Sequence, residues 1–182
     1  MDAHCDNVIV EETERPDLRF VAVPLSTIAG QTMRDWGRDF CRMARPLTAG
    51  EILLGDGHCS GAEEYENLAR AGIDRVLPAE FADTARWAAR VQALADRVDA
   101  IYLMVDVDIL RNEYIPAYFR PEPGGHALET VLGNVRAVMR TGKVLAFSCF
   151  CVDFDKYAQG GETTFESGRQ IIEGGFGAGA ET

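Results

Sequence analysis

Short apolar runs alternate along the chain with segments whose apolar residues recur at helical spacing. The apolar runs predict strands at residues 20–24, 52–54, 75–77, 101–105 and 144–152. The helical spacing predicts helices at residues 31–44, 60–71, 79–96 and 127–139, and a last helix that Thr163 opens with Glu166. Strands that alternate with helices in this way are typical of βαβ units. The pattern therefore predicts an α/β protein with a mostly parallel sheet.

The chain has the length of one domain. With 182 residues it can bury a proper hydrophobic core. We expect a single α/β domain over residues 1–173, followed by a flexible glycine-rich tail over residues 174–182. No apolar run reaches the roughly 20 residues that a membrane helix needs, and the first residues lack the order of a signal peptide. We therefore expect a cytoplasmic protein.

The net charge of −11 bears on the partners of the chain. A strongly acidic surface argues against nucleic acid and against an anionic membrane as the main partner. Part of that charge belongs to residues that are candidate metal ligands, so the acidity of a metal-loaded protein would be lower. We expect a small-molecule ligand and a homo-oligomer, with no nucleic-acid or membrane partner.

The cysteines indicate a reducing environment. Their number is odd and they form no closely spaced framework, which favours free thiols: Cys5, Cys41, Cys59, Cys149 and Cys151. We interpret the two cysteines that flank Phe150 in an apolar run as buried small apolar residues. A softer metal site that combines them with His58 and Cys59 stays open as an alternative.

Two acidic clusters follow the alternation of an extended strand. Asp2, His4 and Asp6 occupy alternate positions, and Asp106 and Asp108 do the same after an apolar run. Alternate side chains of a strand share a face, so the members of each cluster can converge. Carboxylates that converge repel one another unless a cation holds them. The clusters therefore predict a metal centre, although a solvated N-terminus and a strand-end pair that caps a turn stay open.

Carboxylate-rich ligand sets with an imidazole suit Mn²⁺ above all, with Zn²⁺ and Fe²⁺ as competitors. Aspartates can bridge two ions that together activate a water molecule. The reaction class that this chemistry favours is metal-assisted hydrolysis.

The two clusters also resemble the metal signatures of the ureohydrolases, the group of arginase, agmatinase and formiminoglutamase. Asp2-Ala3-His4-Cys5-Asp6 is similar to the first signature. Asp106-Val107-Asp108, followed by the loop that contains Pro121-Glu122-Pro123-Gly124-Gly125, is similar to the second. The resemblance implies a three-layer α/β/α fold like that of arginases and deacetylases. It also implies a centre of two Mn²⁺ ions, with these ligands: Asp2, His4, Asp6, Asp106 and Asp108.

The resemblance further implies a hydrolase that uses metal-activated water on a non-peptide C–N bond of a guanidino- or formimino-type substrate. Asp108 would orient the nucleophile. His126, which follows two glycines after the metal strand, would transfer protons near neutral pH, and His58 is a second candidate. A solvated or helix-capping role for either histidine stays open.

Two positions depart from the resembled pattern in a way that favours another function. Cys151 stands where a glutamate would hold a guanidinium-type substrate, and Ala29 stands where a histidine would assist proton transfer. A neutral cysteine cannot supply the charge-assisted pair of hydrogen bonds that a guanidinium requires. The alternative is therefore a catalytically impaired metal-binding relative or a partner subunit.

The start of the sequence gives one more expectation. A further upstream motif of the resembled group, of the Gly-Gly-Asp-His type, is absent, and only Met1 precedes Asp2. We expect a chain that is shortened at its N-terminus and whose sheet exposes an edge or an apolar face.

Overall fold

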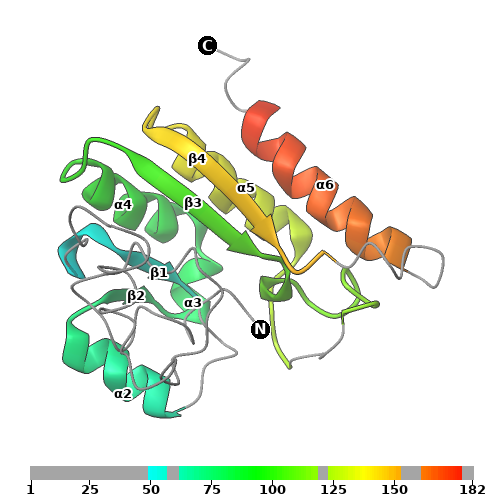
Figure 1. The fold of residues 1–182 in the computed structure, drawn as a ribbon, viewed down its shortest axis with the longest axis horizontal. Helices are drawn as coiled ribbons and strands as arrows, with labels where there is room; N and C mark the ends of the chain where they lie inside the picture. The colour runs from blue at the N-terminus through cyan, green and yellow to red at the C-terminus, as the bar shows by residue number, and fades with distance from the viewer. Residues whose placement is uncertain (1–48, 57–61, 119–122, 153–160, 178–182) are drawn as a thin grey trace, which may run out of the picture. The chain divides into compact units, whose positions relative to one another are not determined.

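The computed structural model describes residues 49–56, 62–118, 123–152 and 161–177 (Figure 1). The chain divides into two compact units, residues 1–75 and 76–182. The strand predicted at residues 20–24 and the helix predicted at 31–44 lie outside the described residues. A single domain over residues 1–173 stays a prediction.

The described part of the first unit holds a small two-stranded sheet and one α-helix. Its described elements are η2 (Ala49–Glu51), β1 (Leu53–Gly55), α2 (Ala62–Ala71) and β2 (Asp74–Val76), whose last residue begins the second unit. Strands β1 and β2 pair with each other. A glycine caps the end of α2: Gly72 has a φ of 70°, and the Ile73 N–H donates to the Leu68 carbonyl at 3.1 Å.

The second unit is built around a parallel pair of strands. Its elements are α3 (Pro78–Phe81), α4 (Thr84–Ala95), β3 (Ile101–Asp106), η3 (Val107–Ile109), α5 (Leu128–Met139), β4 (Val144–Phe150) and α6 (Gly161–Gly177). Strands β3 and β4 run parallel, with Asp106 opposite Phe150 at their carboxyl ends. Helix α5 packs against both α4 and α6, and Figure 1 shows α4 and α5 behind the two strands. The predicted α/β class with parallel strands is confirmed.

A buried asparagine joins three helices of the second unit. The Asn134 side chain on α5 donates to the Phe81 carbonyl at 2.7 Å, and the Trp87 indole on α4 donates to the Asn134 carbonyl at 3.0 Å. The Phe81 and Trp87 rings meet edge to face, with centroids 4.9 Å apart. Because all three residues are buried, each bond forms where water cannot replace it.

The single helix predicted over residues 79–96 is wrong, because the structure has two helices there. Asp83 lies between α3 and α4, and its carboxylate accepts from the Ala85 and Arg86 N–H groups at 3.1 and 3.2 Å. An aspartate in this position caps a new helix N-terminus, which competes with continuing the preceding helix.

The flexible tail predicted from residue 174 is wrong for residues 174–177, which belong to α6. A Cβ atom on Gly174 would lie 2.9 Å from Leu132 Cδ2, and one on Gly175 would lie 3.3 Å from Val135 Cγ1. The glycines therefore let α6 approach α5 closely, and this packing outweighs their low helix propensity. Residues 178–182 lie outside the described part of the chain.

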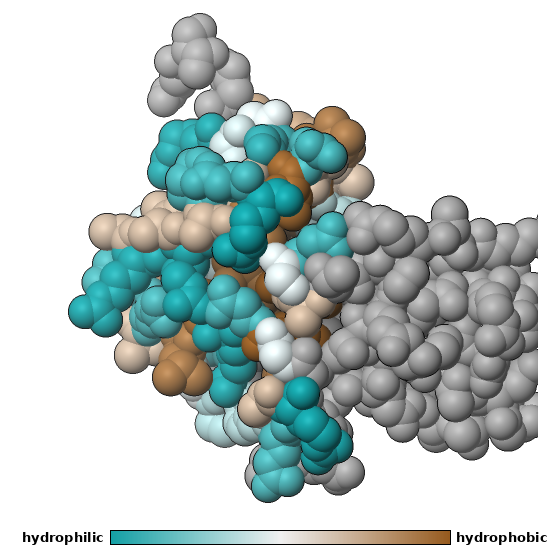
Figure 2. Space-filling model, turned by 90° about the vertical axis from the view of Figure 1, so that its left-hand side faces the viewer, coloured by the Kyte–Doolittle hydropathy of each residue, from teal (hydrophilic) through white to brown (hydrophobic). Residues whose placement is uncertain are grey.

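Apolar side chains are exposed along β4 and α6. Leu145 is 82% exposed and Phe176 is 65% exposed, and the Phe176 ring meets the Phe147 ring with centroids 6.1 Å apart. Within the described residues β4 pairs with β3 alone. On the face drawn in Figure 2, by contrast, hydrophilic residues cover most of the described surface. None of the described helices combines the length and the apolar character needed to cross a membrane.

The loop between η3 and α5 folds back onto the end of η3. The His126 N–H donates to the Ile109 carbonyl at 2.8 Å, and the Arg111 N–H donates to the His126 carbonyl at 3.0 Å. Gly125 makes this approach possible, because a Cβ atom there would lie 2.6 Å from the backbone of Leu110. This close contact holds Gly125 and His126 against the end of η3 and so fixes the path of the backbone there.

We predict that Gly125→Ala lowers the free energy of unfolding by about 3 kcal/mol or more, measured by urea denaturation. Gly142→Ala is the matched control, since Gly142 also has a positive φ (68°) but has no atom within 4 Å of an added Cβ. The control should lose only about 1 kcal/mol, from backbone strain alone. Equal losses in the two variants would contradict the close approach at Leu110.

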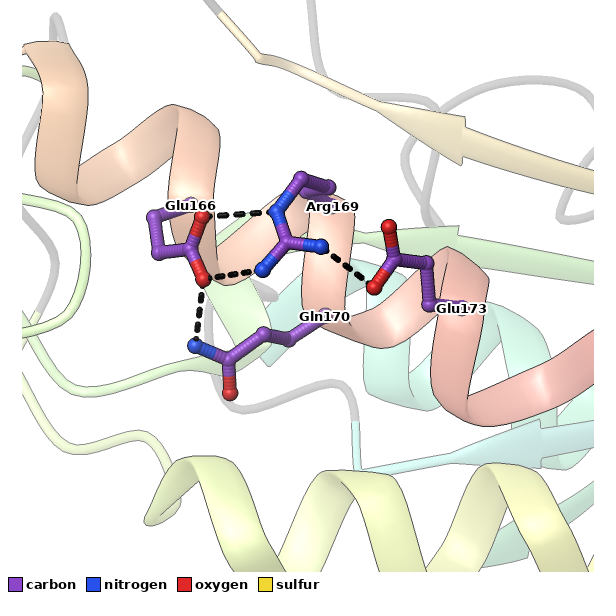
Figure 3. A network of polar contacts seen from close by, with 4 residues as sticks. All are labelled: Glu166, Arg169, Gln170 and Glu173. Atoms are coloured by element: carbon purple, nitrogen blue, oxygen red, sulfur yellow. Dashed lines mark hydrogen bonds and ion pairs between the residues drawn. The ribbon is translucent and has the colours of Figure 1, made fainter. Parts of the chain in front are cut away.

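The outer surface of α6 carries a network of four polar side chains (Figure 3). Arg169 donates to both oxygens of Glu166, at 2.7 and 2.5 Å, and also pairs with Glu173. Gln170 donates to Glu166 at 2.9 Å. Residues three and four apart face each other on a helix, which explains the pairing. The hydrogen bonds from Arg169, followed by that from Gln170, lower the pKa of Glu166 from 4.5 to about 2.

We predict that an NMR titration gives a pKa of about 2 for Glu166, and that Arg169→Gln raises this pKa toward 4.5. Because folding lowers the pKa, the stabilisation is present above pH 4.5 and is lost as the pH falls toward 2. The side chains are exposed, so the effect on stability is small. A Glu166 pKa that is the same in both proteins would contradict the network.

Candidate metal centre

Asp106 and Asp108 lie together at the carboxyl end of β3. Asp106 is the last residue of the strand, whereas Asp108 lies in the short helix η3 that follows. Their side chains are 7% and 5% exposed. The Asp106 carboxylate accepts from the Asp108 N–H at 3.2 Å and so caps η3. The expectation that both residues alternate on one extended strand is therefore wrong, since a helical turn positions Asp108.

Two further donors reach these carboxylates from distant parts of the chain. The Tyr118 hydroxyl donates to Asp108 Oδ2 at 3.3 Å, and the Cys151 thiol donates to Asp106 Oδ2 at 3.1 Å. Cys151 directly follows β4, and the carboxyl ends of neighbouring parallel strands meet at one edge of a sheet. The parallel pairing of β3 and β4 thus explains why Cys151 reaches Asp106.

Helix α6 holds the loop that supplies Tyr118. The Ser167 hydroxyl donates to the Tyr114 carbonyl at 2.8 Å, and the Ala117 N–H donates to Thr164 Oγ1 at 3.3 Å. Both α6 side chains are buried. Tyr118 is itself only 5% exposed, so its hydroxyl has a fixed position beside Asp108.

The thiols near the carboxylates are held in their protonated form. Burial, followed by the negative charge of Asp106, raises the pKa of Cys149 to about 12. The same causes raise the pKa of Cys151 well above its usual range. The interpretation of both cysteines as apolar residues is wrong for Cys151, whose sulfur is hydrogen-bonded to a carboxylate.

The other sequence-predicted site residues have different outcomes. The His126 ring packs against Phe81, with centroids 4.8 Å apart and ring planes at 53°, and its role in proton transfer stays a prediction. The predicted ligands Asp2, His4 and Asp6 lie outside the described residues. Among the residues that are described, no group of three or more His, Cys, Asp and Glu side chains is arranged to hold a metal ion.

Asp106 and Asp108 fit a divalent cation by their chemistry and their burial. Two carboxylates that are nearly removed from water carry a large desolvation penalty unless positive charge or strong donors compensate. Donors to them include a backbone N–H, a phenol and a thiol. Oxygen ligands of this kind suit Mn²⁺ and similar ions. The described part of the centre can therefore contribute two carboxylate ligands.

Sequence reasoning missed the contacts of Tyr118 and Cys151. Tyr118 lies ten residues after Asp108 in an irregular loop, where no periodicity indicates its direction. The sequence did carry a signal for Asp56 in the first unit. Asp56 directly follows the apolar strand β1, and its carboxylate is fully buried.

The parallel strands, the helices packed beside them and the buried aspartates at the strand end define an α/β protein of the arginase-like, three-layer type. The sequence profile of the Arginase family matches residues 1–173. The chain belongs to that family.

Individual relatives agree with this assignment. Formimidoylglutamase of Citrobacter koseri is 36% identical over 94 residues, which are 50% of this chain and 29% of that protein. The structure resembles Entamoeba histolytica arginase in complex with L-ornithine, with a TM-score of 0.63 and 20% identity over 78% of this chain and 48% of that one. It also resembles Bacillus subtilis formimidoylglutamase, with a TM-score of 0.64 and 13% identity over 73% and 43%. The chain spans at most about half the length of these relatives.

We predict that Tyr118→Phe lowers the free energy of unfolding by about 1–2 kcal/mol, because it removes a donor from a buried carboxylate. Tyr102→Phe is the matched control, since its hydroxyl bonds the neutral Ser148 hydroxyl at 2.7 Å and should contribute only about 0.5–1 kcal/mol. Urea denaturation at pH 7 measures both. A smaller loss in the Tyr118 variant than in the control would contradict the proposed support of Asp108.

Proposed function

We propose that this chain is a metal-dependent hydrolase that cleaves a non-peptide C–N bond of a small amidine-like substrate. The observation that carries the proposal is the buried pair of carboxylates at the end of β3, in a chain of the Arginase family. Both guanidino and formimino compounds belong to this substrate class. The 36% identity to a formimidoylglutamase favours the formimino type.

Asp106 and Asp108 would hold the metal together with Asp2, His4 and Asp6, and two Mn²⁺ ions suit this set. Divalent ions bound there would lower the pKa of a water molecule and so supply hydroxide near neutral pH. The burial of Asp106 and Asp108 supports such a role, because carboxylates that bulk water does not solvate interact strongly with a cation.

Two side chains of the second unit would assist the reaction. Asp108, which accepts a hydrogen bond from the Tyr118 hydroxyl, would orient the attacking water. His126 would transfer the proton to the leaving group. Its backbone hydrogen bonds to Ile109 and Arg111 hold it in a fixed position beside η3, the short helix that follows β3. The assembly that we propose is a homo-oligomer in the cytoplasm, without nucleic-acid or membrane partners.

A second candidate function is that of a catalytically impaired metal-binding protein or partner subunit. The observation that favours it is the thiol of Cys151, which is neutral and bonds Asp106 at the site of the predicted substrate-binding glutamate. A site without that charge binds a guanidinium more weakly. Substrates that lack a guanidinium group are therefore the more informative ones to test.

We predict that the chain binds about two Mn²⁺ ions when incubated with excess metal, and that Asp108→Asn loses them, as measured by mass spectrometry of metal content. Asp99→Asn is the control, because Asp99 is an exposed aspartate of the same unit.

Turnover is measured by the release of ammonia or formamide from formiminoglutamate, and of urea from arginine and agmatine. Asp108→Asn should reduce turnover at least about 100-fold.

The outcomes separate the two candidate functions. Metal binding and hydrolysis that both depend on Asp108 support the enzyme. Metal binding that depends on Asp108 without hydrolysis of any of the three substrates supports the impaired relative. Metal content that is equal in the Asp108 and Asp99 variants would contradict a metal centre at β3.

A further inference from the structure

Cys151 and Asp106 form a mixed sulfur and oxygen pair at the end of the parallel strands. Asp106 lies opposite Phe150 in the register of β3 and β4, and Cys151 is the next residue. Its Sγ atom lies 3.1 Å from Asp106 Oδ2. The second oxygen, Oδ1, accepts the Asp108 N–H and thereby fixes the carboxylate plane. The sulfur therefore sits beside the other oxygen of a carboxylate whose orientation is fixed.

The backbone of Cys151 has an unusual conformation. Its φ is 65°, and in the described part of the chain Asp56 is the other non-glycine residue with a positive φ. A residue with a Cβ atom adopts this region at a cost in free energy, and such residues cluster at functional sites. The left-handed conformation turns the chain at the end of β4 so that the Cys151 side chain meets Asp106.

The spacing of the two atoms agrees with that of two ligands of one ion. Zinc binds sulfur at roughly 2.3 Å and carboxylate oxygen at roughly 2.0–2.2 Å, so two such ligands at 90–110° lie about 3.1–3.7 Å apart. The observed distance of 3.1 Å falls at the lower end of this range. An ion could therefore replace the thiol hydrogen with little movement of either side chain.

We propose that Cys151 binds, through its sulfur, the ion that Asp106 holds, and so shifts the preference of that position from Mn²⁺ toward Zn²⁺ or Co²⁺. The inference rests on the metal centre of the proposed function. When the bond from sulfur to the metal forms, the thiol proton passes to solvent. The positive ion then takes the place of that proton beside Asp106. Thiolate ligands select softer ions, whereas a site of carboxylate and imidazole ligands alone suits Mn²⁺.

The experiment uses Co²⁺ as a probe in the 182-residue chain. A bond between cobalt and thiolate gives an intense near-ultraviolet charge-transfer band that carboxylate and imidazole ligands do not give. We expect this band in the unmodified chain and its loss in Cys151→Ser, with Co²⁺ still bound. Cys149→Ser is the matched control, since Cys149 is a half-buried cysteine two residues earlier on β4, and it should keep the band.

Competition between metals gives a second readout. Cys151→Ser should weaken Zn²⁺ binding about 10–100-fold and change Mn²⁺ binding less than about threefold. Circular dichroism and urea denaturation of both serine variants verify that each is folded.

The possible results distinguish this inference from the proposed function. Co²⁺ that binds through Asp108 without a charge-transfer band, or with a band that Cys151→Ser retains, would overturn the role of Cys151 and leave the metal centre standing. Co²⁺ content that does not change in Asp108→Asn would overturn the metal centre and this inference together. A band that disappears in Cys151→Ser and persists in Cys149→Ser would support it.

Discussion

The arrangement of the second unit depends on keeping two carboxylates out of water at the end of an apolar strand. Asp106 and Asp108 are almost fully buried, and a buried carboxylate is unfavourable unless its oxygens are bonded. The η3 backbone, the loop at Tyr118 and Cys151 after β4 each supply a donor to them. Each of these elements must therefore hold its position for the aspartates to remain inside.

Other parts of the unit stabilise the elements that carry those donors. Gly125 lets the returning loop approach the end of η3, and the buried hydroxyls of α6 anchor the loop before Tyr118. Asn134 connects α5 to α3 and α4. The parallel register of β3 and β4 places Cys151 beside Asp106. A structural contact far from the carboxylates can thus change the geometry of the candidate centre, which is why stability measurements bear on function here.

Much of the fold follows from local patterns in the sequence, whereas the contacts of the site do not. The apolar run before Asp106 predicted β3, whereas the burial of Asp106 and Asp108 is seen only in the structure. The cap at Asp83 carries a local signal that the long apolar period of residues 79–96 obscured. Helix α6 continues through Gly174 because it packs on α5, a tertiary effect that propensity does not contain. The bonds of Tyr118 and Cys151 join residues 10 and 45 positions apart, so they depend on loop path and strand register.

The chain belongs to the Arginase family, and we propose that its buried aspartates Asp106 and Asp108 hold metal. The most direct test is anomalous X-ray diffraction from crystals of this chain grown with Mn²⁺, recorded on both sides of the manganese absorption edge. If the two aspartates hold the metal, an anomalous peak lies within about 2.2 Å of an oxygen of Asp106 or Asp108, with a second peak about 3.5–4 Å away. An ordered pair of aspartates with no anomalous peak beside either of them would contradict it.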